Sequence, residues 1–227
     1  MARLESLPQL HEGKLDGGYL AVAFDLDGTL YDQKKLRRNM AFRLGTYYLF
    51  HPLRIKDLLL LKTFRQVRDH WDEIVKTAGD ADRNDPDAAM YDYVARKHGA
   101  DASRVEAVVK RWIYEDPLSV LPKYTDTDLA AYIASLRQNH IPVLIFSDYP
   151  IEDKLCALRI QADGMYAPGD ERAIGLKPSP SGLMQILSDL NLKAEQLLMV
   201  GDRDEKDGES ARRAGVDYVI VHGKKRR

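Results

Sequence analysis

Two acidic clusters in the sequence each follow an apolar run and could hold a metal ion. The first lies in Asp25-Leu26-Asp27-Gly28-Thr29, directly after the run Tyr19–Phe24. The second comprises Asp202 and Asp207, and it follows the apolar run 197–200. Carboxylates this close together repel one another unless a cation lies between them or one of them keeps a proton. Oxygen donors without neighbouring His or Cys favour Mg²⁺ over zinc.

Three further side chains could bind the oxygens of a phosphate. Thr29 adds a hydroxyl to the first acidic cluster, and Ser147 follows the apolar run 141–146. Lys177 precedes a proline and a helical pattern, so it could reach a phosphate or a carboxylate. Taken alone, neither Ser147 nor Lys177 is specific. Asp207 is also ambiguous by itself, because carboxylates are favoured near the start of any helix.

The elements that must position these residues alternate between strands and helices. Continuous apolar runs predict buried parallel strands at 19–24, 141–146, 197–200 and 218–221. Helical patterns lie between them, at 126–139, 179–190 and 205–214. This alternation predicts an α/β fold with a mainly parallel sheet. Polar groups at the carboxyl ends of such strands share one crevice. We therefore expect Asp25, Asp27, Ser147 and Asp202 to converge.

The segment 32–119 breaks the alternation and shows helical periodicity almost throughout. We expect it to form a small all-helical cap, inserted into an α/β core made of 1–31 and 120–227. Residues 44–64 are unusually apolar for such a cap and are interleaved with bases. They are expected to pack the cap's own core. The alternative is an apolar partner surface, through which the cap could oligomerise, or a site for a lipid-like phosphate substrate.

Taken together and in this order, the motifs resemble those of the haloacid dehalogenase superfamily, in particular its phosphoglycolate phosphatase-like members. The segment 25–29 matches the family's first motif, Ser147 its second and Lys177 its third. Gly201-Asp202 with Asp207 matches the fourth. The likeness covers about 1–30 and 120–225, and the cap matches only in length, position and helical character. It implies a Rossmann-like three-layer parallel sheet core.

The resemblance also implies a mechanism and a role for each residue. Asp25 would attack phosphorus and form an aspartyl-phosphate, while Asp27 would protonate the leaving oxygen and then activate water. This role requires that Asp27 hold a proton when substrate arrives. The phosphoryl oxygens would be bound by Thr29, Ser147 and Lys177. Mg²⁺ would be bound by the side chains of Asp25 and Asp202 and by the backbone carbonyl of Asp27. Asp207 would support the metal through water or orient Lys177.

The expected function is therefore Mg²⁺-dependent hydrolysis of a small phosphorylated metabolite. A phosphosugar mutase of the same fold is one alternative, and a catalytically silent binding module is another. Family members that remove halogens lack the second aspartate as a general acid, so Asp27 argues against dehalogenation. The neighbour of Ser147 is often Asn or Gly in the family, so the role of Asp148 stays open.

Composition and charge limit the partners that the chain could have. The 227 residues are 44% hydrophobic and 30% charged, which is ordinary for a soluble globular protein. A net charge of -1 gives no basic field for nucleic acid. No run approaches the ~18 apolar residues that span a bilayer, so we expect no stable membrane insertion. Without a secretion signal, a cytoplasmic location is expected. The single cysteine, Cys156, is expected to be a buried thiol.

Overall fold

The computed structural model describes residues 5–71, 74, 86–169 and 174–221. The chain divides into two compact units, one of residues 1–33 with 121–227 and one of residues 34–120. We call the first the sheet unit and the second the helical unit. The sequence predicted a division at 31/32 and 119/120, and the capping role of the helical unit stays a prediction.

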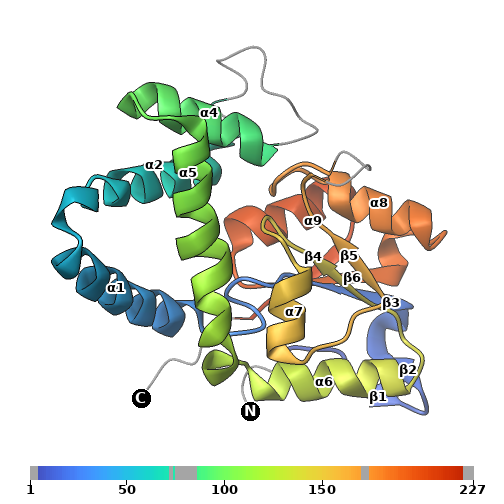
Figure 1. The fold of residues 1–227 in the computed structure, drawn as a ribbon. Helices are drawn as coiled ribbons and strands as arrows, with labels where there is room; N and C mark the ends of the chain where they lie inside the picture. Colours follow the sequence, from blue (N-terminus) through green and yellow to red (C-terminus); the bar gives the residue numbers. More distant parts are fainter. Residues whose placement is uncertain (1–4, 72–73, 75–85, 170–173, 222–227) are drawn as a thin grey trace. The chain divides into compact units, whose positions relative to one another are not determined.

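The sheet unit contains a five-stranded sheet in which every neighbouring pair is parallel. The strand order is β5 (Gly164–Tyr166), β4 (Val143–Phe146), β3 (Ala21–Phe24), β6 (Leu197–Gly201) and β7 (Asp217–Ile220). Val22 of β3 is in register with Val143 on one side and with Leu198 on the other. The α/β prediction is confirmed, and β3 is the middle strand (Figure 1).

Helices cover both faces of this sheet, which explains why its central strands are apolar at every position. Ala21 and Ala23 belong to a buried cluster with α8 (Ser181–Asp189) and α9 (Glu209–Ala214). On the other face, Phe24 makes an edge contact with Tyr132 of α6 (Thr127–Gln138). Figure 1 shows α6 and α8 on opposite sides of the sheet. The sheet unit is thus a three-layer structure, as predicted.

Three local features of the sheet unit differ from the sequence expectations. Strand β5 was not predicted, because three residues are too few to show a periodic pattern. No strand was predicted before residue 19, but Leu10–His11 and Lys14–Leu15 form the hairpin β1–β2. The prediction of a buried Cys156 is wrong. Helix α7 (Glu152–Leu158) buries the face that carries Lys154, Leu155 and Leu158, and this leaves the thiol exposed.

The helical unit contains α1 (Gln33–Phe50), α2 (Asp57–Asp69), α4 (Pro86–His98) and α5 (Ala102–Val109), which continues as a π-helix over Lys110–Glu115. Its core is apolar, and it includes Phe64, Met90, Val94, Val105 and Val109. The buried guanidinium of Arg68 pairs with Asp87, whose other carboxylate oxygen accepts a 2.6 Å hydrogen bond from Tyr114. None of the described helices is long and apolar enough to cross a membrane.

The apolar stretch 44–64 only partly packs the core of the helical unit. Leu60, Leu61 and Phe64 on α2 are buried, as expected. The prediction is wrong for the turn that joins α1 to α2. Leu49 and Phe50 are about three quarters exposed (75% and 74%), and Leu53 is 95% exposed.

Candidate active site

The predicted site residues lie at the carboxyl ends of the three central strands of the sheet. Asp25 follows β3, Ser147 follows β4 and Asp202 follows β6. One carboxylate oxygen from each of Asp25, Asp202 and Asp207 lies within 4.8 Å of the other two. Acids far apart in the sequence therefore form a single carboxylate cluster at one edge of the sheet.

Two glycines make room for this cluster. Gly28 has a φ of +105°, and a Cβ at this position would lie 2.3 Å from Asp202 Oδ2. A Cβ on Gly201 would lie 2.4 Å from the carboxyl carbon of Asp207. Both contacts are far shorter than any tolerated approach between such atoms. The absence of a side chain at Gly28 and Gly201 therefore allows the carboxylates to lie close together, since any side chain there would displace one of them.

Lys177 is buried in the middle of the site and joins two of its acids. Its Nζ lies 2.5 Å from Asp25 Oδ1 and 2.6 Å from Asp207 Oδ1. Burial works against the charged ammonium, but the two carboxylates outweigh it and raise the pKa of Lys177. The other oxygen of Asp207 accepts 3.1 Å hydrogen bonds from the backbone N–H groups of Asp202 and Arg203. Asp207 thus orients Lys177 through one carboxylate oxygen and holds the loop that carries Asp202 through the other.

The surroundings of Asp25 and Asp202 do not fully compensate a negative charge on either carboxylate. Burial raises the pKa of Asp25 to about 8; Lys177 opposes this rise, while Asp207 and Asp202 add to it. Burial, with the neighbouring Asp207, also raises the pKa of Asp202 to about 6. Asp202 Oδ1 is buried and has no hydrogen-bond partner among the residues that the structure describes. An oxygen-only cluster with an unpartnered carboxylate oxygen is a donor set that fits Mg²⁺.

The side chain of Asp27 points to a different set of partners. Lys154 of α7 binds both of its carboxylate oxygens, at 2.6 and 2.8 Å. The Tyr31 hydroxyl donates a hydrogen bond to it, and Ser147 Oγ donates another at 3.3 Å. Burial opposes ionisation of Asp27, but Lys154 outweighs burial and lowers its pKa. The general-acid role expected of Asp27 therefore requires that its side chain gain a proton when substrate arrives.

Two other predicted positions have clear contacts. Thr29 is fully buried, and its Oγ1 donates a 2.9 Å hydrogen bond to Asp25 Oδ2. Asp148, whose role the sequence left open, accepts a 2.7 Å hydrogen bond from the backbone N–H of Lys177. It therefore positions the loop that carries the lysine. Sequence reasoning missed Lys154 and Tyr31. Tyr31 lies four residues after Asp27, but Lys154 gave no signal beyond following the second motif.

A comparison with protein families decides which kind of protein this is. Residues 19–215 match the family described as haloacid dehalogenase-like hydrolase. The chain belongs to this family. It is thus a hydrolase of the haloacid dehalogenase (HAD) family, with Asp25, Ser147, Lys177 and Asp202 at the carboxyl edge of the family's sheet.

Solved structures share the fold of this HAD hydrolase at low sequence identity. The 2-haloacid dehalogenase from Pseudomonas syringae pv. Tomato DC3000 is 16% identical with a TM-score of 0.61, over 89% of this chain and 86% of that one. The magnesium-bound HAD hydrolase YfnB from Bacillus subtilis is 14% identical with a TM-score of 0.62, over 89% and 88%. The L-2-haloacid dehalogenase from Xanthobacter autotrophicus, with chloropropionic acid covalently bound, is 18% identical with a TM-score of 0.58, over 89% and 77%. No curated protein matches the sequence.

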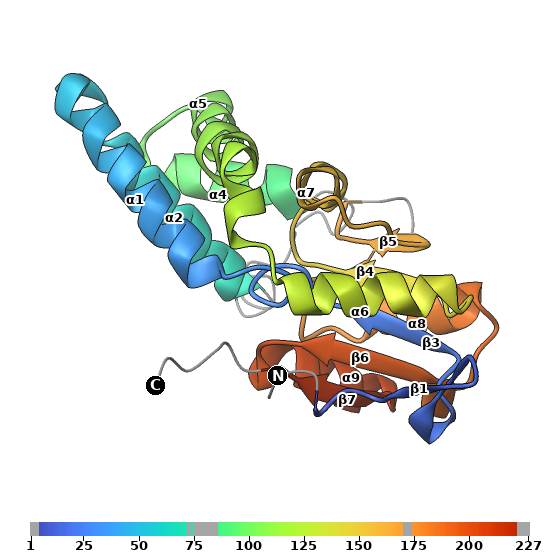
Figure 2. The ribbon, with the colours of Figure 1, turned by 90° about the horizontal axis from the view of Figure 1, so that it is seen from below.

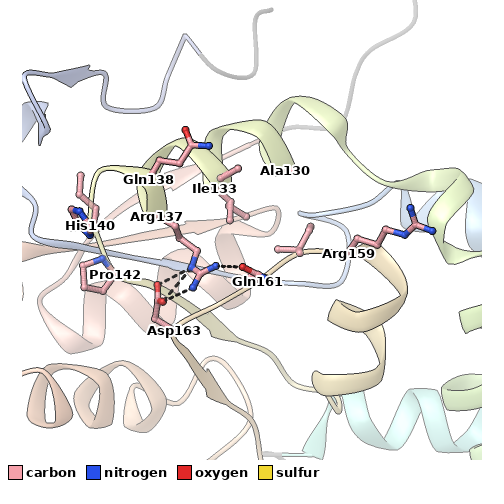
Figure 3. Close-up of a pocket in the computed structure, with 12 residues that line it drawn as sticks. Ala130, Ile133, Arg137, Gln138, His140, Pro142, Arg159, Gln161 and Asp163 are labelled. Atoms are coloured by element: carbon pink, nitrogen blue, oxygen red, sulfur yellow. Dashed lines mark hydrogen bonds and ion pairs between the residues drawn. The ribbon is translucent and has the colours of Figure 1, made fainter.

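The HAD hydrolase also has a pocket at the opposite end of β4 from Ser147, with a volume of about 750 Å³. Figure 3 shows Arg137 of α6 in this pocket, bonded to Asp163 and Gln161. The arginine is already paired with a carboxylate there, and none of the predicted site residues lines the pocket. The predicted site residues therefore belong to the carboxylate cluster and not to this pocket.

Proposed function

We propose that this HAD hydrolase cleaves small phosphomonoesters in a Mg²⁺-dependent reaction, through an aspartyl-phosphate on Asp25. The observation that carries the proposal is the carboxylate cluster of Asp25, Asp202 and Asp207, which contains one buried lysine. Three ionised carboxylates beside the single ammonium of Lys177 would leave an excess of negative charge, which a divalent cation would neutralise. A dianionic phosphoryl group could not approach Asp25 without such neutralisation.

The side chains of Asp25 and Asp202, with the backbone carbonyl of Asp27, would hold the metal ion. When bound, Mg²⁺ would neutralise charge on the phosphoryl oxygens and favour an in-line attack. Asp207 would act mainly through Lys177, which it contacts at 2.6 Å. The raised pKa of Asp25 and the unpartnered oxygen of Asp202 both support a cation site at this position.

The side chains of the site divide the chemistry among them. Asp25 attacks phosphorus, and the bond from phosphorus to the leaving oxygen breaks as that oxygen takes a proton from Asp27. Asp27 then takes a proton from water, which attacks phosphorus and releases phosphate and Asp25. Thr29, Ser147 and Lys177 bind the phosphoryl oxygens.

This scheme requires a proton on Asp27, although Lys154 keeps the ligand-free side chain ionised. A phosphoryl group is an anion and would compete with Asp27 for the Lys154 ammonium. We therefore include in the proposal that substrate binding weakens the Asp27–Lys154 pair and lets Asp27 take up its proton.

Dehalogenation is the second candidate, because solved structures of the same fold include 2-haloacid dehalogenases. In that reaction Asp25 would attack carbon as the carbon–halogen bond breaks, and water would then hydrolyse the resulting aspartyl ester to a hydroxy acid and free Asp25. The halide leaves without a proton or a divalent cation, so Asp27 with its three partners would have no leaving oxygen to protonate. For this reason we favour the phosphatase. A phosphosugar mutase differs only in passing the phosphoryl group to a second sugar.

The test is to measure phosphate release from sugar phosphates, nucleotides and small phosphoacids, with Mg²⁺ and with EDTA. Halide release from 2-chloropropionate is measured in parallel. We expect Mg²⁺-dependent phosphate release, which Asp25→Asn abolishes and Asp27→Asn reduces by about 10²–10⁴-fold. Asp163→Asn, which changes an acid outside the site, is the matched control and should keep full activity.

Metal-independent halide release without phosphate release would overturn the proposal in favour of the dehalogenase. Phosphate transfer that occurs only when an acceptor sugar is present would favour the mutase. A chain that binds the phosphoesters but turns over none of them would favour the binding module.

A further inference from the structure

The second half of α1, the turn after it and the start of α2 expose a set of large apolar side chains. We call this set the tip patch, and its members are Phe42, Leu49, Phe50, Leu53, Ile55 and Leu59. All six are more than half exposed, and Leu53 in the 3-10 turn Pro52–Arg54 is 95% exposed. Figures 1 and 2 both show this turn at one end of the helical unit. Several large exposed apolar side chains in one short segment mark an interaction surface more often than chance exposure.

The tip patch lies within a segment whose exposed charges are all positive. Between residues 33 and 62 the exposed bases are Lys34, Lys35, Arg37, Arg38, Arg54, Lys56 and Lys62. The single carboxylate of this segment is Asp57, which is buried and pairs with Arg104 at 2.6 Å. The four bases between 34 and 38 lie in the first two turns of α1, at the far end of that helix from the turn. The positive charge that lies nearest to the turn in the sequence is that of Arg54 and Lys56.

Apolar side chains flanked by basic residues match the surface of a membrane that contains anionic lipids. Leucine and phenylalanine side chains can enter the boundary between lipid headgroups and acyl chains, while lysine and arginine pair with anionic headgroups. A second copy of this chain fits less well, because a two-fold contact would bring the same bases face to face. Nucleic acid would satisfy the bases but would leave the aliphatic side chains of Leu49, Leu53 and Ile55 without a partner.

We propose that the tip patch docks this protein on membranes that contain anionic lipids. The helical unit would lie on the headgroup layer with the apolar side chains of the α1–α2 turn inserted and Arg54 and Lys56 beside them. This is peripheral binding, and it agrees with described helices that are too short or too polar to cross a bilayer. The proposal does not depend on the reaction that the sheet unit performs.

The test is co-sedimentation of the full-length chain with lipid vesicles. One set of vesicles contains phosphatidylcholine alone, and the other contains about 30% phosphatidylglycerol as the anionic lipid. We expect at least about tenfold stronger binding to the anionic vesicles, with a decrease as salt rises through the range that screens surface charge. Phe50→Ser with Leu53→Ser should reduce this binding at least tenfold, and Arg54→Glu with Lys56→Glu should do the same.

Matched controls test whether binding depends on the tip patch itself, and not on any exposed apolar side chain or on the net charge of the chain. Leu20→Ser with Met184→Ser removes two other exposed apolar side chains, both from the sheet unit. Lys14→Glu with Lys123→Glu makes the same change in net charge as the tip charge variant. Both controls should bind anionic vesicles like the unchanged chain. Circular dichroism checks the fold of each variant. If Phe50→Ser with Leu53→Ser unfolds, the binding of Arg54→Glu with Lys56→Glu tests the proposal instead.

Three results would overturn the proposal. The first is that the unchanged chain fails to sediment with anionic vesicles at low salt. The second is that the tip variants and the controls lose binding equally. The third is that analytical ultracentrifugation shows a dimer which Phe50→Ser with Leu53→Ser dissociates, because the patch would then serve contact between two copies.

Discussion

Replacing Gly28 by alanine tests whether the closeness of the acids sets the activity of this hydrolase. Gly28 has a φ of +105°, a conformation that side chains rarely adopt, and the strain should cost about 1–3 kcal/mol of folding free energy. At roughly 2–4 °C per kcal/mol for a chain of this size, the melting temperature should fall by about 2–12 °C. This part of the effect is independent of the site.

The second part of the effect is specific to the site. The new Cβ would lie 2.3 Å from Asp202 Oδ2, so the carboxylate must move back by about 1 Å to reach an ordinary contact. A displacement of about 1 Å in a catalytic centre can reduce the rate by about 10²-fold. We therefore expect Gly28→Ala to reduce kcat about 100-fold and to weaken Mg²⁺ binding, as measured by phosphate release and by titration calorimetry.

Gly18→Ala is the matched control for this prediction. Gly18 also has a positive φ, +78°, but a Cβ there would meet nothing within 4 Å. Its melting temperature should therefore fall to a similar extent, while its kcat and its Mg²⁺ affinity stay unchanged. If Gly28→Ala kept the kcat and the metal affinity of Gly18→Ala, the inference that Gly28 positions Asp202 would be refuted.

Three further predictions concern contacts outside the carboxylate cluster. Asp148→Ala leaves a buried backbone N–H without an acceptor and should cost about 1–3 kcal/mol in urea unfolding, whereas Asp148→Asn keeps an acceptor and should cost less. Arg68→Met leaves a partly buried acid without its ion-pair partner and should cost at least about 2 kcal/mol. Lys110→Met, at an exposed pair, should leave the unfolding free energy nearly unchanged. Partial burial opposes ionisation of Asp163, but Arg137 outweighs it and lowers the pKa. The stabilisation by the ionised Asp163 should therefore be complete above pH ~4, and it should be lost as the pH falls through the lowered pKa of the folded state. Asp163→Asn should then lower the melting temperature at pH 7 but should change it little near pH 3. An equal effect at both pH values would contradict this assignment.

The central strands and the convergence of the acids could be predicted from the sequence for one physical reason. Strands buried on both faces must be apolar at every position, as 21–24 and 143–146 are, and the polar residue that follows each strand marks its end. Parallel strands place these ends at one edge, so Asp25 and Asp202 had to meet there. The match of four ordered motifs then indicated the family.

The features that the sequence did not predict depend on which face of an element is covered. Lys154 lies on α7, and nothing in the spacing shows that this helix brings its ammonium to Asp27. The apolar density of 44–64 predicts burial, but α1 buries Tyr48 while it exposes Leu49 and Phe50. Strand β5 was not predicted because pairing with β4, and not an apolar pattern of its own, makes these three residues a strand.

The position of β3 in the middle of the sheet has a consequence for the biosynthesis of the chain. During translation β3 emerges long before either neighbour, since β4 begins at Val143 and β6 at Leu197. The helical unit, made of contiguous residues, can therefore complete its core while β3 still waits with both edges unpaired. Nascent chains of this topology should depend on chaperones that shield an early apolar strand, and they should fold more slowly than a protein whose strands pair in order of synthesis.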